Sequence, residues 1–207
     1  MSQPGRGDKS DPMRVVPITL EGARVRLEPL EERHRAEFVA AACSDPGIFR
    51  WFTHQWDTPE LAQGFFDHLR ASVGRGECVA FATIDRATGR LAGGTCFMAL
   101  APEHRRLEIG STWIVPEFQR THVNTEAKLL MFRHCFEMLG CVRVELKTDV
   151  LNERSRNAML RIGCTQEGVL RSHMVCQGGR LRDTIYFSVL APEWPRVREH
   201  LERLILR

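Results

Sequence analysis

Residues 78–115 contain three consecutive strand-like runs, and this stretch constrains the fold more than any other part of the sequence. The runs are "CVAFATI", "LAGGTCFMAL" and "RRLEIGSTWIV". The first two are joined by "DRATGR", whose Gly89 is suited to a turn. Strands joined by short connections pair antiparallel, so we predict a three-stranded antiparallel meander.

The alternation in the third run predicts which side chains share a face. One face is expected to carry Leu107, Ile109 and Trp113. The other is expected to carry Arg106, Glu108, Gly110 and Thr112. The first face would pack in a core, and the second would be polar.

Helical and strand patterns alternate around this meander. Helical spacing is found in "EERHRAEFVAAAC", in "TPELAQGFFDHLRASV" after the N-cap Thr58, in "LLMFRHCFEMLG" up to Gly140, in "NERSRNAMLRIG" from Asn152 to Gly163, and in "PEWPRVREHLERLILR". Strand patterns are found in "ITLEGARVRLEPL", in "VRVELKT", and in a hairpin that turns at Gly178 and Gly179. We predict one mixed α/β (α+β) domain over residues 14–207. Residues 1–13 are polar and rich in Gly, Pro and Ser, which predicts a disordered leader.

Composition excludes several classes of protein. The net charge of +3 falls short of the basic stripe expected of a nucleic-acid binder, and no apolar run approaches the ~18 residues of a membrane span. The seven cysteines include no C-x-x-C pair, which indicates a reduced, cytoplasmic chain. Cys and His are not clustered as zinc ligands, so we expect no metal. The arginine-rich stretches "EHRRLE" and "RLRDT" are most simply interpreted as solvated strand faces.

The segment "PEFQRTHVNTEAK", residues 116–128, joins the third strand to a helix without a single glycine. A strand, a short turn and a helix often form an anion site, because the first N–H groups of a helix have no partner within it. Such sites are usually rich in glycine. From the residues alone, an ordinary turn capped by Thr121 or Asn124 is the simpler interpretation.

Four segments in this order resemble the GNAT N-acetyltransferases, in the branch that contains ribosomal-protein N-terminal acetyltransferases. They are "LEIGSTWIVPEFQRTHVNTEA", "ELKTDVLNERSRNAMLRIGC", "QEGVLR" and "GRLRDTIYFSVL", within a match from about Ile18 to Leu190. The resemblance implies a central, mostly antiparallel sheet flanked by helices. That sheet would be splayed open between its fourth and fifth strands, with acyl-CoA, most simply acetyl-CoA, in the splay.

The resemblance also implies that the glycine-free loop holds the pyrophosphate of CoA. The family pattern Q/R-x-x-G-x-G/A falls on Gln119 to Asn124, so His122 and Asn124 replace small residues. The loop can still serve if both side chains point away, because helix N–H groups bind anions whatever the side chains are. The implied cofactor residues of the loop and its helix are Arg120, Thr121, His122, Val123, Asn124 and Thr125. Asn152 would hold the pantetheine arm, with help from Arg156.

Acetyl transfer needs a base for the amine proton, because an alkylamine is mostly protonated at neutral pH. Glu108 is the best candidate, although it could be a surface residue paired with Arg105 or Arg106. The oxyanion could be met by backbone N–H groups around Ile114 and Val115.

For the leaving thiolate, the branch carries a serine at the position of Ser155. This serine could orient the sulfur, or it could satisfy N–H groups of the helix beside Asn152.

The amine pocket is expected near the loop "IFRWFTHQW", where Trp51 and Phe52 either wall the pocket or belong to the core. We predict an N-acetyltransferase that works by direct attack in a ternary complex. A donor such as succinyl-CoA, a non-catalytic acyl-CoA-binding module and a nucleic-acid-binding domain are the rivals. The closing helix could be exposed and dock a second copy. No membrane or nucleic-acid partner is expected.

Overall fold

The computed structural model describes residues 13–206, so the predicted leader lies outside the described residues except for Met13, which is buried in the core. One eight-stranded sheet runs through the molecule in the order β1-β2-β3-β4-β5-β6-β8-β7. The strands are β1 (Leu20–Glu21), β2 (Val25–Pro29), β3 (Val79–Asp85), β4 (Leu91–Ala101), β5 (Arg106–Ile114), β6 (Arg143–Asp149), β7 (Thr165–Val175) and β8 (Leu181–Leu190). Neighbours pair antiparallel throughout, except β5 and β6, which are parallel. The predicted meander and mixed α/β class are confirmed.

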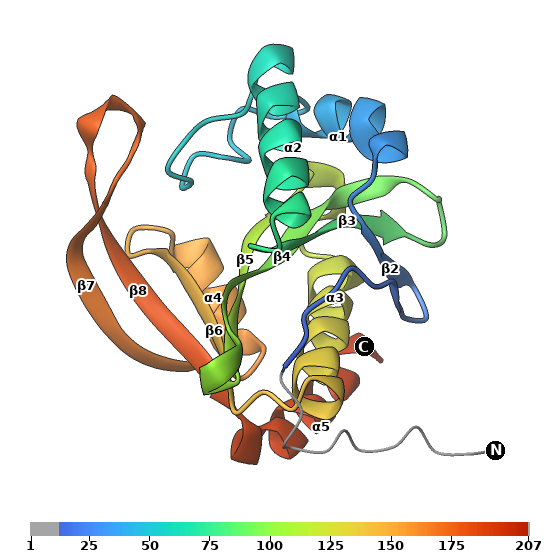
Figure 1. Cartoon of the computed structure of the whole chain (residues 1–207), viewed down its shortest axis with the longest axis vertical. Coiled ribbons are helices and arrows are strands. Elements are labelled where there is room, and N and C mark those ends of the chain that lie inside the picture. Colours follow the sequence, from blue (N-terminus) through green and yellow to red (C-terminus); the bar gives the residue numbers. More distant parts are fainter. Residues whose placement is uncertain (1–12, 207) are drawn as a thin grey trace.

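The sheet is splayed between β5 and β6. These strands pair only over Arg106–Glu108 and Arg143–Glu145. Beyond that point β5 stays paired with β4 as far as Ile114, while β6 stays paired with β8 as far as Asp149. The two strands therefore part after Glu108 and leave a wedge with unpaired backbone edges on both sides. In Figure 1 the β7–β8 hairpin and β6 lie to one side of the wedge.

Helices cover the sheet from both faces. They are α1 (Arg35–Ala42), α2 (Pro59–Gly74), α3 (His122–Arg133), which continues as a π-helical segment over His134–Met138, α4 (Glu153–Arg161) and α5 (Trp194–Ile205). Figure 1 shows α1 and α2 together at one end of the molecule, and α3 with α5 at the other. No helix within residues 13–206 has the length and apolar character needed to cross a bilayer.

The closing helix α5 packs against α3. Its Trp194, Val197 and Leu201 are buried, and the Trp194 ring lies 5.5 Å from that of Phe136 at the end of α3. The prediction that this helix is exposed was therefore wrong for its apolar side. Docking of a second copy stays a prediction, and it would need another surface.

A bulge at Ser111 corrects the predicted faces of β5. Ser111 has φ +47°, and the register with β4 shifts between Gly94 and Cys96. The extra residue reverses the alternation that follows. Trp113 therefore faces α1, where its ring lies 5.0 Å from that of Phe38, while Thr112 faces α3. The prediction that grouped Trp113 with Leu107 was wrong, because alternation assumes an unbroken strand.

Local signals at the ends of elements were predicted well. Thr58 and Asn152 both cap their helices through side-chain oxygens. Gly140 and Gly163 end helices with φ of +62° and +93°. Such positive φ values favour glycine because it has no Cβ.

Candidate functional site

Glu108 lies at the apex of the wedge, at the last residue pair that joins β5 to β6. Its side chain is buried, with 3% exposed, and its Oε2 lies 2.9 Å from Nζ of Lys147 on β6. Burial raises the pKa of this carboxyl, although the Lys147 ammonium opposes the shift. The alternative of an exposed glutamate is wrong, because Glu108 is buried, and Arg106 pairs with Glu145 instead. Arg105 donates to the main-chain carbonyls of Leu139 and Gly140.

Gly110 makes room for the Glu108 carboxylate. A Cβ on Gly110 would lie 2.7 Å from Glu108 Oε1 and 2.6 Å from Met98 Sδ. Real Cβ atoms essentially never approach so closely, so a larger residue would displace the carboxylate. The sequence offered a signal for this role, a glycine inside a strand pattern, which often marks a close approach.

The two predicted oxyanion donors, the main-chain N–H groups of Ile114 and Val115, point to opposite edges of β5. The N–H of Val115 donates to Ala92 O at 3.0 Å, so it is unavailable, and the prediction for that group was wrong. Amide directions alternate along a strand, which turns the N–H of Ile114 toward the opposite edge. That edge is the one left open by the wedge, so Ile114 keeps its predicted place.

The start of α3 supplies unpaired N–H groups beside the wedge. Thr121 is the N-cap: its Oγ1 accepts from Val123 N at 3.3 Å and donates to Phe118 O at 2.7 Å. Arg120 has the left-handed φ, +61°, that a glycine would adopt more easily. The main-chain N–H groups of His122 and Asn124 belong to the first turn, where the helix offers no acceptor.

The His122 side chain turns away from this helix start. Its Nε2 lies 3.2 Å from Asp85 Oδ1 at the end of β3. Burial raises the pKa of Asp85, but the hydrogen bonds from Thr88 and this contact together outweigh burial and lower it. A residue larger than glycine at this position therefore leaves the N–H groups accessible. An anion site without glycine requires that the side chains of the loop point away from the anion, and His122 meets this condition.

Thr125 joins α3 to α4. Its side chain is buried, and its hydroxyl accepts from Arg161 of α4 at 2.9 Å. Contact between Thr125 and the cofactor stays a prediction. The position lies one turn into α3, where the side chain packs toward α4.

Three predicted residues gather where α4 begins, beside the end of β6. Asn152 Oδ1 accepts from Ser155 N at 3.1 Å, so Asn152 is itself the cap. The Ser155 hydroxyl forms no hydrogen bond with residues 13–206 and is half-buried. Arg156 donates to Val150 O at 3.0 Å, and its buried Nε has no partner among the described residues.

Gln119 and Arg154 join the two sides of the wedge, and we did not predict either role. Gln119 Nε2 donates to Ile114 O at 2.8 Å, and its Oε1 accepts from Arg154 Nη1 at 2.9 Å. The first residue follows β5 and the second lies in the first turn of α4. Only the fold brings them together.

The loop "IFRWFTHQW", residues 48–56, which we call the aromatic loop, contacts the β7–β8 hairpin and closes the α1–α2 side of the wedge. Gln177 N donates to Thr53 O at 2.7 Å. Phe52 belongs to the core, with its ring 5.3 Å from Phe49. Trp51 is half-buried between the guanidinium groups of Arg50 and Arg180, at 5.0 and 5.9 Å from the ring. Phe52 therefore belongs to the core, and the role of Trp51 as a wall of the amine pocket stays a prediction.

Strand β8 carries two buried polar residues that we did not predict as part of the site. Arg182 is 7% exposed and Thr184 is fully buried. Arg182 Nε and Thr184 Oγ1 have no hydrogen-bond partner among residues 13–206. The interpretation of "RLRDT" as a solvated strand face is therefore wrong for Arg182, because the aromatic loop covers it: Nη1 reaches Trp51 O at 3.5 Å.

Lys128 of α3 is buried on the other face of the sheet. Its Nζ donates to Thr112 Oγ1 at 2.7 Å and reaches Thr95 Oγ1 at 3.5 Å. Burial lowers its pKa to about 8. The lysine thereby ties α3 to β5 just after the Ser111 bulge. Among the described residues it forms no ion pair, and no group of three His, Cys, Asp or Glu gathers as metal ligands there.

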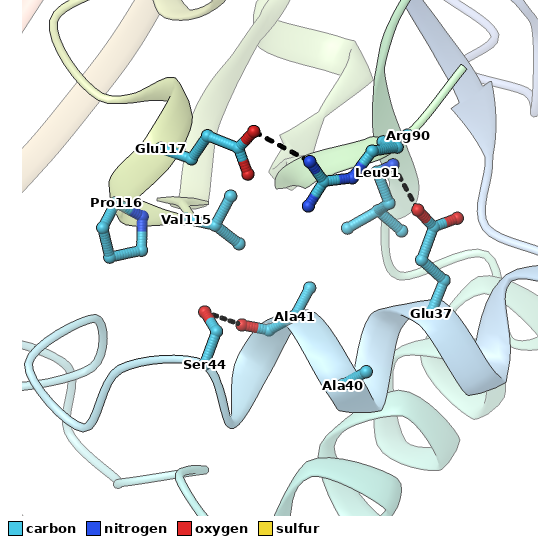
Figure 2. A pocket seen from close by; sticks show the side chains of 9 residues that line it. All are labelled: Glu37, Ala40, Ala41, Ser44, Arg90, Leu91, Val115, Pro116 and Glu117. Atoms are coloured by element: carbon cyan, nitrogen blue, oxygen red, sulfur yellow. Dashed lines mark hydrogen bonds and ion pairs between the residues drawn. The ribbon is translucent and has the colours of Figure 1, made fainter. Parts of the chain in front are cut away.

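A second hollow of about 460 Å³ lies between α1 and the ends of β4 and β5 (Figure 2). Its charged side chains are paired: Arg90 lies 2.8 Å from Glu117, and Glu37 accepts from Leu91 N at 2.7 Å. It borders the β4 edge of β5, away from the wedge. We call it the α1 groove.

Comparisons with known proteins agree with this arrangement. A profile described as "Acetyltransferase (GNAT) domain" matches residues 24–165. YoaA of Bacillus subtilis (strain 168), named an uncharacterized N-acetyltransferase, is 30% identical over 174 residues, which are 84% of this chain and 97% of YoaA. YdaF of the same strain, provisionally named a ribosomal N-acetyltransferase, is 35% identical over 106 residues, or 51% of this chain and 57% of YdaF. The crystal structure of a GCN5-related N-acetyltransferase from Brucella melitensis has a TM-score of 0.87 and 33% identity, covering 95% of this chain and 90% of that one.

Proposed function

The chain belongs to the GNAT acetyltransferase family and is an N-acetyltransferase, and we propose that it transfers acetyl from acetyl-CoA to a primary amine in a ternary complex. The observation that carries this proposal is the buried Glu108 carboxylate at the point where β5 and β6 part. A base belongs there, because the apex is where a thioester held in the wedge would meet an amine that enters from the α1–α2 side.

Glu108 removes the proton that the amine must lose. The amine nitrogen then forms a bond to the thioester carbonyl carbon, the carbon–sulfur bond breaks, and the leaving thiolate takes up the second proton that the nitrogen releases as it becomes an amide. A raised pKa suits this role, because a general base works best when its pKa lies closer to the operating pH. Lys147 keeps the carboxylate charged and fixes its direction from 2.9 Å.

The wedge supplies the other interactions. The oxyanion of the tetrahedral intermediate would meet N–H groups on the open edge of β5, such as that of Ile114. The free Ser155 hydroxyl would orient the sulfur. A thiol has a pKa of about 8.5, so the thiolate needs little acid help to leave.

The donor would be held mainly by main-chain groups. Its pyrophosphate would lie at the start of α3, against the N–H groups of His122 and Asn124, with Arg120 adding charge. The two amides of its pantetheine arm suit the unpaired edges of β5 and β6, as an added strand would. Gln119, Arg154, Asn152 and Arg156 line the mouth through which this arm passes.

A thermal-shift titration tests the donor. Acetyl-CoA and free CoA should both raise the melting temperature, because a ligand that binds only the folded state stabilises it. A transfer assay over a panel of amines and peptide N-termini then tests catalysis. No shift with either ligand at millimolar concentration would overturn the proposal, and a shift without turnover would favour a binding module.

A further inference from the structure

Two buried polar residues of β8, Arg182 and Thr184, share a face of the sheet with the proposed base. β8 pairs with β6 so that Thr184 is opposite Asp149 and Tyr186 is opposite Lys147. Because side chains two residues apart share a face, Arg182 and Thr184 lie on the side of the sheet that carries Lys147 and Glu108. Burial raises the pKa of Glu108 and lowers that of Arg182, and each of these two charges opposes the shift of the other.

The charges on this face do not cancel. Glu108 pairs with Lys147 at 2.9 Å, and Asp149 pairs with Arg180 at 2.6 Å. Among the described residues, Arg182 forms no ion pair, and its one hydrogen bond is the 3.5 Å contact with Trp51 O. One buried guanidinium is therefore left in excess, and a buried charge without a partner destabilises a fold.

The unpaired atoms belong to residues two apart on one face of β8 and are two kinds of donor. Arg182 Nε is a fixed donor, and the Thr184 hydroxyl can rotate to donate. Buried polar groups in folded proteins are nearly always paired, so two such groups without partners on one strand face indicate a missing ligand. Two donors with a positive charge match a carboxylate, which accepts several hydrogen bonds.

We infer that Arg182 and Thr184 bind a carboxylate of the acceptor, so that the enzyme acts on amines that carry an anionic group a short distance from the nitrogen. This inference rests on the proposed function, since it places the amine at Glu108. The carboxylate can belong to a small amino acid or to an acidic side chain near a peptide N-terminus. Arg182 would be a specificity-determining residue, with the aromatic loop closing over the bound acceptor.

The test uses acceptors that differ only in charge. β-Alanine and γ-aminobutyrate would be compared with their amides, and Ala-Asp-Ala with Ala-Asn-Ala, both peptides as C-terminal amides, each as melting shifts of the CoA complex and as kcat/KM. We expect the acids to exceed their neutral partners by roughly 10- to 100-fold in kcat/KM, the usual effect of a charge-assisted hydrogen bond. The small-molecule and peptide series distinguish the two sources of the carboxylate.

Arg182→Met should reduce the preference for acids to about twofold while acetyl-CoA binding stays normal. It should also raise the melting temperature of the free protein, because it removes a buried unpaired charge, whereas a merely structural arginine would lower it. Arg171→Met, at an exposed arginine of β7, is the matched control and should change neither property.

If acids and their amides give equal melting shifts and equal kcat/KM with the wild-type protein, the inference is overturned whatever the variants do. Loss of the acetyl-CoA shift would instead count against the proposed function. A drop in stability of Arg182→Met with an unchanged acid preference would assign the arginine to folding alone.

Discussion

The α1 groove and the wedge border opposite edges of β5, and they differ in how their polar groups are paired. In the α1 groove, Arg90 and Glu117 neutralise each other, and Glu37 is held by Leu91 N (Figure 2). In and beside the wedge, the Ser155 hydroxyl, Arg182 Nε and Thr184 Oγ1 have no hydrogen-bond partner among the described residues. The polar groups of the α1 groove are thus paired within the protein, whereas the wedge has unpaired polar groups that a ligand could bind. Pairing, and not the volume of a hollow, distinguishes a site from a surface depression.

The largest expected effect concerns Glu108, at the apex of the wedge. Glu108→Gln should lower kcat/KM by ~10²-fold or more at neutral pH, a usual cost of losing a general base. In the wild-type enzyme the acid limb of kcat/KM should fall above the ordinary glutamate pKa of 4.5, because burial raises the pKa of Glu108 and only the deprotonated form accepts a proton. That limb should vanish in the variant.

Acetyl-CoA affinity is the control for this variant and should change little, because Glu108 contacts the amine side. Near-normal turnover of Glu108→Gln across the pH range would remove this residue from the mechanism.

The next prediction concerns Lys128, a buried charge on the other face of the sheet. Within residues 13–206 it has hydrogen bonds to Thr112 and Thr95 but no ion pair. Its pKa of about 8 lies below the ordinary 10.5, so the unfolded chain binds more protons between these values. Stability should therefore rise with pH across that window. Relative to Lys128→Met, the wild type should gain up to about 3 kcal/mol of unfolding free energy from pH 7 to above pH 10, at 1.36 kcal/mol per pKa unit.

Denaturant unfolding of both proteins at several pH values measures this difference, and their comparison cancels every other titrating group. At pH 7 the methionine variant should be the more stable one. If the difference in unfolding free energy between the two proteins does not change with pH, the lysine is already neutral or well solvated.

Gly110→Ala tests the space that the Glu108 carboxylate needs. The added Cβ would meet Glu108 Oε1 at 2.7 Å, so the carboxylate must shift. We expect turnover to fall by about tenfold with an unchanged melting shift from CoA, since small misplacements of a catalytic group are costly. Gly168, on the edge strand β7, meets nothing within 4 Å, so Gly168→Ala is the control, and equal losses in both would refute the role of Gly110.

The smallest effect belongs to the α1 groove. Arg90→Met removes an ion pair whose partners are both more than half exposed, and such pairs contribute about 0–1 kcal/mol. Turnover and acetyl-CoA affinity should stay within about twofold of the wild type. A tenfold loss of either would show that the groove takes part in function and that pairing is a poor guide.

The sequence was informative where structure depends on neighbours along the chain. The caps Thr58 and Asn152, the stops at Gly140 and Gly163 and the strand at Glu108 all follow from local chemistry. The bulge at Ser111 did not, because a positive φ on serine has no sequence signature. The burial of Arg182 depends on a loop more than a hundred residues away, so no local pattern in "RLRDT" could have revealed it.

A crystal structure with acetyl-CoA tests the central claim most directly. The account predicts the pyrophosphate at the start of α3, around Arg120 to Asn124. It predicts the pantetheine arm between β5 and β6, and the thioester carbonyl within reach of an amine held at Glu108. Acetyl-CoA bound in the α1 groove, or bound with its thioester on the α3 face of the sheet beside Lys128, would contradict it.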